Sequence, residues 1–196
     1  MRKMKKLFIM SLKEMKRVSC ITLIAMMGAI SIVLGYLTLM PVDTIKITFN
    51  FLPNEFVYYL FGPAVGAIYG ASLDILTFFI RPTGTFFYGF TISAILSGLW
   101  HGALLYQRPL SLKRMIAVKF IFAVTVHIFL NTFWLTQLYG YNYWALLPTR
   151  ALKTAITFPI EILLLYTLIN RAEATGIIRR IKGSDVYYNR KTKESL

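Results

Sequence analysis

Long apolar stretches alternate with short polar or glycine- and proline-containing connections along almost the whole chain. This pattern predicts six helices, over residues 19–40, 52–61, 63–80, 86–106, 112–138 and 145–170. Most of these stretches are close to or above the roughly 20 apolar residues that a helix needs to cross a bilayer. The second stretch is short, and without it the two ends of the chain would lie on opposite sides of the membrane. The pattern favours an all-α, six-helix bundle in a membrane.

Residues 41–51 break the helical pattern. Apolar and polar positions alternate there and several side chains are β-branched, which is typical of a strand or of an extended loop over the mouth of a pocket. The helix before this segment is expected to end at Pro41, because proline lacks the backbone N–H that a helix interior needs.

A ridge of small residues runs along the helix predicted over 63–80. Gly62, Gly66, Gly70 and Asp74 are four residues apart and therefore fall on one face. Glycines on such a face let a second helix approach closely, which is how helices associate in lipid. An isolated carboxylate inside a bilayer costs a few kcal/mol, so Asp74 should face a partner, a cavity or a ligand. A packing face with a satisfied carboxylate and a ligand site both fit this pattern.

Composition supports a membrane protein. The 196 residues are 57% hydrophobic with a mean hydropathy of +0.60, which a soluble domain of this size seldom reaches. The formal net charge is +14, and it is concentrated at the ends: seven basic residues precede Ser19 and seven more follow from Arg171 onward. Basic flanks beside apolar spans predict a multi-pass protein of the cell membrane with both termini cytoplasmic. No nucleic-acid recognition module is visible, so we expect no nucleic-acid partner.

Residues 1–18 mix basic and apolar positions. They predict either an amphipathic helix on the anionic surface of the lipid bilayer or a solvated tail.

Polar and aromatic side chains collect at the expected outer ends of the last four helices. The candidate site residues are Asp74, Arg81, Thr85, Phe86, Phe87, Asn131, Trp134, Tyr139, Arg150 and Lys153. Cations at this depth need an anionic partner, either Asp43, Glu55 or Asp74 within the chain or an acidic ligand. Glu161 lies eleven residues after Arg150, which places both on one side of the last helix, and we expect it to be structural.

These residue types suit one kind of ligand. Aromatic rings stack on a flat heterocycle, amide and carboxylate groups bind its donors and acceptors, and arginine binds a carboxylate through two parallel hydrogen bonds. The set therefore favours a flat heteroaromatic acid. An interfacial aromatic belt with structural ion pairs fits the same residues.

Signatures of catalysis are absent from the sequence. The two histidines are far apart, and there is neither an HExxH motif nor a GxxxxGK[ST] nucleotide loop. Cys20 is the only cysteine, which excludes an intrachain disulfide and a cysteine-based metal site. No internal repeat of the kind common in secondary transporters is visible. We expect a non-enzymatic chain without a metal or cofactor, which depends on a partner for energy.

An ordered set of motifs runs through residues 19–170. It consists of Ala25-Met26-Met27-Gly28-Ala29, Phe61-Gly62-Pro63-Ala64-Val65-Gly66 with Asp74, Arg81-Pro82-Thr83-Gly84-Thr85-Phe86-Phe87-Tyr88-Gly89-Phe90-Thr91, Asn131-Thr132-Phe133-Trp134-Leu135, Arg150, and Pro159-Ile160-Glu161. The set resembles the substrate-binding S components of energy-coupling factor (ECF) vitamin transporters, most closely the folate-specific members.

The resemblance implies a fold and a function. It implies six helices and a vitamin site near the outer face, gated by the loops after the first and third helices. The expected domains are a basic cytoplasmic segment (1–18), a transmembrane substrate-binding domain (19–170) and a basic cytoplasmic tail (171–196). It further implies that the chain binds folate, that S components topple in the membrane to release cargo, and that a binder of another vitamin or precursor is the nearest alternative.

The resemblance also implies partners. These are a transmembrane coupling subunit and two cytosolic ATPases, which would use the ATP. In this family an Ala-x-x-x-Ala face of the first helix contacts the coupling subunit, and it maps onto Ala25 and Ala29. An intramembrane enzyme would need a catalytic pair at one depth, which is not visible. A structural membrane protein would not need Asp74, Arg150 and Lys153 together.

Overall fold

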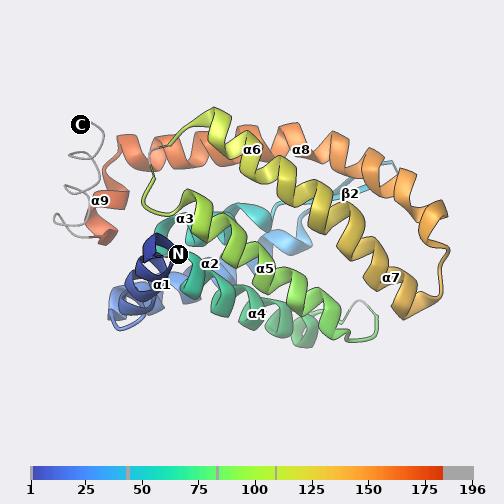
Figure 1. Ribbon diagram of the computed structural model, residues 1–196, viewed down its shortest axis with the longest axis horizontal. Coiled ribbons are helices and arrows are strands. Elements are labelled where there is room, and N and C mark those ends of the chain that lie inside the picture. Colours follow the sequence, from blue (N-terminus) through green and yellow to red (C-terminus); the bar gives the residue numbers. More distant parts are fainter. Residues whose placement is uncertain (1, 43–44, 83, 109, 183–196) are drawn as a thin grey trace.

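The computed structural model describes residues 2–42, 45–82, 84–108 and 110–182. Figure 1 shows long helices lying side by side along one axis, which confirms the predicted all-α bundle; a short β-hairpin is added to it. In chain order the elements are α1 (Arg2–Glu14), α2 (Val18–Tyr36), β1 (Thr38–Val42), β2 (Ile45–Thr48), α3 (Phe51–Phe61), α4 (Pro63–Ile80), α5 (Tyr88–Leu105), α6 (Leu112–Phe122), the π-helix η1 (Ala123–Leu130), α7 (Asn131–Tyr139), α8 (Tyr143–Ala174) and α9 (Ile177–Lys182). Asp43 and residues 183–196 of the predicted tail lie outside the described residues.

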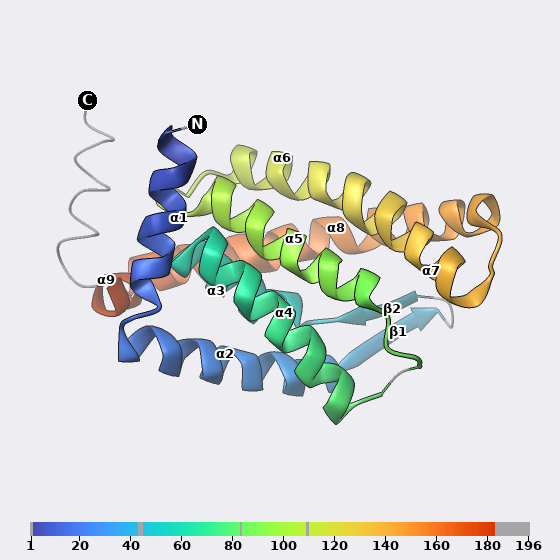
Figure 2. The same ribbon diagram turned by 60° about the horizontal axis from the view of Figure 1, so that its bottom comes forward.

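Among the described residues, five helical stretches are long and apolar enough to cross a membrane. They are α2, α4, α5, the rod formed by α6, η1 and α7, and α8. The predicted second helix, α3, has only 11 residues. Figure 2 shows that β2 and α3 together return the chain from the hairpin toward the end that carries α1. Their combined rise is on the order of 30 Å, about the thickness of the hydrocarbon core, which is long enough for the predicted sixth pass.

The first predicted helix is shorter than expected. Residues 19–40 were expected to be helical, but α2 ends at Tyr36, and β1 pairs antiparallel with β2 through Thr38 with Thr48 and Leu39 with Ile47. Pro41 disfavours the helical region for the residue before it, and the hairpin gives the backbone an alternative set of hydrogen bonds. The strand interpretation of residues 41–51 is confirmed for β2 and for the last two residues of β1, whereas residues 38–40 of β1 were expected to be helical.

The glycine ridge of α4 packs against α5, as one of its two interpretations predicted. A Cβ atom added at Gly66 would lie 2.8 Å from the carbonyl oxygen of Gly98, and one at Gly70 would lie 2.6 Å from that of Ala94. Larger residues would push the two helices apart. Asp74 comes one helical turn later on the same ridge, so its carboxylate is directed to the α4–α5 seam.

α3 is the most buried helix of the bundle. Side chains from Phe56 to Phe61 are all at most 6% exposed. It contacts α2, α4, α5 and α8, and a helix enclosed in this way can be apolar on every face. This central helix carries Glu55 into the middle of the bundle.

The segment before the first span forms a helix, α1, as one of the two alternatives for residues 1–18 predicted, while its contact with the lipid surface stays a prediction. α1 and α9 lie at the same end of the bundle in Figures 1 and 2. Buried Ser11 of α1 donates a hydrogen bond to the carbonyl oxygen of Phe61 (2.6 Å) and accepts one from the backbone N–H of Val65 (3.1 Å). These bonds attach α1 to the α3–α4 connection. The opposite end, which carries the α4–α5 and α7–α8 connections, is called the loop end below.

Candidate ligand-binding site

A cavity of about 470 Å³ lies between α3 to α5 on one side and α6 to α8 on the other. Its volume is within the usual range for small-molecule sites. In the described part of the chain, six charged side chains line it together with aromatic, amide and hydroxyl groups. The charged residues are Glu55, Asp74, Lys119, Arg150, Lys153 and Glu161.

A π-helical stretch forms part of the cavity wall. The helix predicted over 112–138 is continuous, but its middle, η1, is π-helical. This wider turn directs Ala123, Val126 and His127 into the cavity, between Lys119 and Asn131 on the same rod. π-Helical segments are frequent at functional sites. The apolar run of η1 has no sequence feature that distinguishes it from an α-helix.

A hydrogen-bonded chain orients Asn131. The Trp134 indole N–H donates to the Ser93 hydroxyl (3.2 Å), which donates to the Asn131 side-chain oxygen (2.7 Å). The Asn131 NH₂ group has no hydrogen bond among the described residues and is open to a ligand. Trp134 does not line the cavity and acts on Asn131 only through the Ser93 hydroxyl. Its ring packs against that of Phe87, with centroids 5.8 Å apart.

Asp74 and Arg150 both line the cavity but do not pair. Asp74 accepts a hydrogen bond from the Thr91 hydroxyl at 2.6 Å. Arg150, half-buried near the loop-end start of α8, forms no hydrogen bond or ion pair with any residue in the described ranges. The internal Arg150–Asp74 ion pair, one of the alternatives from the sequence, is therefore not formed. The Arg150 guanidinium lines the cavity, and no described residue accepts a hydrogen bond from it.

Other predicted site residues line a second, adjacent cavity of about 340 Å³. Arg81, Thr85, Phe86, Phe87 and Tyr139 belong to it, and it shares Asp74 and Phe90 with the first cavity.

Arg81 also has a contact that the sequence did not suggest. Its guanidinium donates to the Gly35 carbonyl oxygen (2.8 Å) and lies over the Tyr36 ring. It therefore ties the loop-end terminus of α4 to that of α2. The predicted residues thus divide into a set that lines the main cavity, a set in and near the α4–α5 loop that lines the second cavity, and Trp134, which lines neither.

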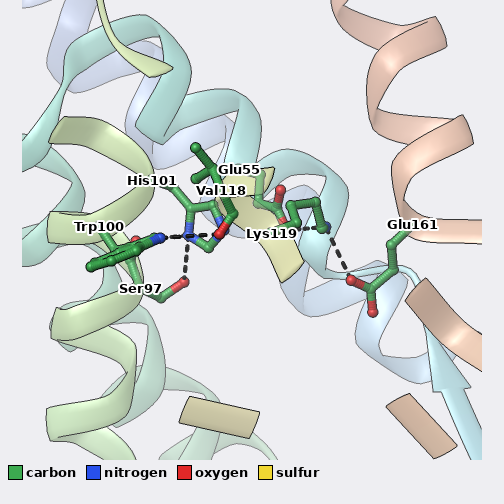
Figure 3. A network of polar contacts seen from close by, with 7 residues as sticks. All are labelled: Glu55, Ser97, Trp100, His101, Val118, Lys119 and Glu161. Carbon is green, nitrogen blue, oxygen red and sulfur yellow. Dashed lines mark hydrogen bonds and ion pairs between the residues drawn. The ribbon is translucent and has the colours of Figure 1, made fainter. Parts of the chain in front are cut away.

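An ion network in the main cavity was missed by the sequence analysis. The Lys119 Nζ atom lies 2.6 Å from Glu55 Oε1 and 3.0 Å from Glu161 Oε2, and Figure 3 shows these three side chains meeting from different helices. Each residue was noticed singly, but no spacing in the sequence relates α3, α6 and α8. One feature of the sequence did indicate such a network. An ionisable residue within an apolar membrane helix costs free energy and therefore needs a partner. Glu161, predicted to be structural, therefore holds Lys119 as well as lining the cavity.

Within the part of the chain that the structure describes, no group of three or more His, Cys, Asp or Glu side chains could hold a metal ion.

The small-residue face of α2 points away from the bundle. Ala25 and Ala29 are exposed, whereas Gly28 beside them is buried, and a Cβ atom there would be 3.6 Å from the Tyr69 ring. Docking to a coupling subunit remains a prediction for this face.

Three comparisons with known proteins agree with this architecture. A protein named Folate transporter FolT from Clostridium novyi (strain NT) is 32% identical over 167 residues, 85% of this chain and 97% of that protein. Another of that name, from Leuconostoc mesenteroides subsp. mesenteroides, is 27% identical over 165 residues, 81% of this chain and 89% of that protein. A solved structure described as the crystal structure of FolT bound with folic acid is 29% identical, with a TM-score of 0.72, and the match covers 79% of this chain and 95% of that one.

The family-level match covers the whole membrane part. A model of the ECF transporter substrate-specific component matches residues 19–172, which span α2 to α8 and all the residues that line the two cavities. This chain therefore belongs to the substrate-specific components of ECF transporters.

Proposed function

We propose that this chain captures folate from outside the cell and delivers it inward as the S component of an ECF importer. The observation that carries the proposal is the main cavity, where Arg150 faces the interior without an acidic partner among the described residues. The similar proteins named as folate transporters support the choice of ligand. A non-transport structural protein would have no use for an unpaired guanidinium in a cavity.

The chemistry of folate matches the lining of this cavity. Folate combines a flat pterin ring, a second aromatic ring and a glutamate with two carboxylates. Phe51, Phe90, Phe122 and Phe158 line the cavity and offer ring contacts. Arg150 and Lys153 place two cations on one face of the first turns of α8, where they would bind the carboxylates.

The charge distribution supports an orientation in the membrane. The basic α1 and α9 lie at one end of the bundle, and the positive-inside rule places that end in the cytoplasm. The loop end then faces outward, so the ligand would enter between the β-hairpin and the α4–α5 loop. Energy would come from a coupling subunit, docked on the Ala25 and Ala29 face, and from two ATPases.

Binding by the isolated chain tests this function. The purified chain in detergent is expected to bind folate without ATP, because the cavity lies entirely within it. Titration should give saturable quenching of intrinsic tryptophan fluorescence, since Trp134 contacts the lining residue Ser93. Saturable binding of an unrelated vitamin with no response to folate would show that the chain serves another ligand.

Arg150→Ala is expected to weaken folate binding by roughly 2 kcal/mol or more, the effect of truncating a desolvated charge pair. The melting temperature without ligand should stay near that of the wild type, because Arg150 has no ion pair to lose within the described ranges. Arg150→Lys should recover little affinity, since an ammonium cannot form two parallel hydrogen bonds with a carboxylate.

Arg171→Ala, an exposed arginine at the other end of α8, is the matched control and should change neither quantity. A large loss of apo stability in Arg150→Ala, with affinity unchanged in the folded fraction, would make Arg150 structural.

A further inference from the structure

Two buried polar atoms at one end of the main cavity have no hydrogen-bond partner among the described residues. They are Glu55 Oε2 and His101 Nε2, on side chains from α3 and α5. Glu55 is 7% exposed and His101 is 2% exposed, and both line the cavity. A buried polar atom without a partner is costly, so such atoms commonly mark a site that a ligand completes. We call this pair the acceptor floor.

Both atoms of the acceptor floor are hydrogen-bond acceptors. Lys119 occupies Glu55 Oε1 at 2.6 Å, which leaves the second carboxylate oxygen open. His101 Nδ1 lies 3.0 Å from the Ser97 carbonyl oxygen, and because a carbonyl can only accept, Nδ1 carries the proton. In a neutral imidazole Nε2 is then an acceptor. A ligand that satisfies this floor must present N–H donors.

The charges around the floor add to this preference. Lys119 is shared between Glu55 and Glu161, so two carboxylates surround a single cation. Figure 3 shows His101 beside this network. The local charge therefore favours a ligand edge that donates hydrogen bonds and disfavours an anionic group.

The cationic end of the cavity is distant from the floor. Arg150 precedes Glu161 by eleven residues on α8, which corresponds to about 16 Å along the helix. α8 runs from the loop end toward the end that carries α1 and α9. Arg150 comes earlier in α8 than Glu161 and is therefore nearer the loop end. An elongated ligand with a donor edge at one terminus and carboxylates at the other would satisfy both ends at once.

We propose that the acceptor floor binds the donor edge of the ligand's heterocycle, with Glu55 and His101 as specificity-determining residues. In folate this edge is the ring N–H and the neighbouring 2-amino group of the pterin. The pterin then lies deepest and the glutamate faces the loop end. This inference rests on the proposed folate function and adds the direction in which the ligand is held.

The test compares folate with its 2-deamino analogue, which lacks one donor of the edge. Wild-type protein should bind folate at least about tenfold more tightly than the analogue, because a site built around a hydrogen bond rejects a ligand that cannot form it. Glu55→Gln should weaken folate binding on the order of thirtyfold. It should also bring the ratio of the affinities for folate and for the analogue close to one. The same variant should bind p-aminobenzoylglutamate, which has no pterin, as the wild type does.

Two further variants keep the test decisive. His101→Phe keeps a ring beside Phe122 but removes the acceptor, so it should also lower the preference for folate without touching the ion network. Glu173→Gln is the matched change of a carboxylate that lines neither cavity, and it should leave the preference unchanged.

The possible outcomes separate this assignment from the proposed function. A wild type that does not bind folate overturns both. The wild type could bind folate without preferring it over the analogue, or Glu55→Gln and His101→Phe could both keep the preference for folate. Either result would show that the assignment of the acceptor floor is wrong, while the proposed function would stand. Loss of the preference in Glu173→Gln as well would also overturn the assignment, because Glu173 lies outside both cavities.

Discussion

Replacing Lys119 by methionine is expected to destabilise the ligand-free protein by about 3–5 kcal/mol. Lys119 is the shared cation of two carboxylates, and the side chains of Lys119 and Glu55 are only 4% and 8% exposed. Removing it would leave Glu55 and Glu161 without the cation that they share. Breaking a buried pair in this way costs more than replacing the whole network by neutral groups.

The effect should appear as a lower melting temperature of the purified protein in detergent. Lys113→Met changes an exposed lysine on the same helix and serves as the control, with a melting temperature close to the wild type. Combining Lys119→Met with Glu55→Gln and Glu161→Gln should restore much of the loss, since no unpaired charge remains. Equal melting temperatures for Lys119→Met and Lys113→Met would mean that the ion network contributes little.

Placing tryptophan at Ala25 or Ala29 is expected to abolish ATP-driven folate uptake while folate binding persists. Both alanines are exposed on α2, and neither lines the cavity. Helices in lipid associate through small residues, so a bulky indole on this face would keep a partner helix away. The prediction depends on the proposed docking of a coupling subunit at this face.

Uptake into cells or proteoliposomes that contain the complete transporter gives one readout, and folate binding by the purified variant gives the other. Leu163→Trp, at a position of α8 that is 66% exposed, introduces the same ring into lipid and should support normal uptake. If either alanine variant lost folate binding in proportion to uptake, the face would contribute to internal packing and not to docking.

Local patterns in the sequence were sufficient for the helices and for one seam between them. The ridge of Gly66 and Gly70 follows from a four-residue spacing, and the structure places it against Gly98 and Ala94 of α5. The polar residues near helix ends were also identified individually, and Asp74, Asn131, Arg150 and Lys153 do line one cavity. Each of these conclusions needs only the geometry of a single helix.

Features that depend on competing backbone arrangements were not predictable in this way. Residues 38–40 form part of β1 where a helix was expected, because the strand at Ile45–Thr48 offers their backbone an alternative set of hydrogen bonds. The π-helical η1 has the same apolar composition as an α-helix, so only packing against α8 and the cavity distinguishes it.

The sequence by itself determined a multi-pass membrane chain with basic ends, because hydrophobicity and charge act locally on each segment. It also determined that buried ionisable residues would be present. Only the tertiary structure decided that Lys119 meets Glu55, 64 residues away, and Glu161, while Arg150 remains open to the cavity. Helical periodicity predicts which face of a helix a residue occupies. Which residues of different helices come into contact depends on how all the helices pack together.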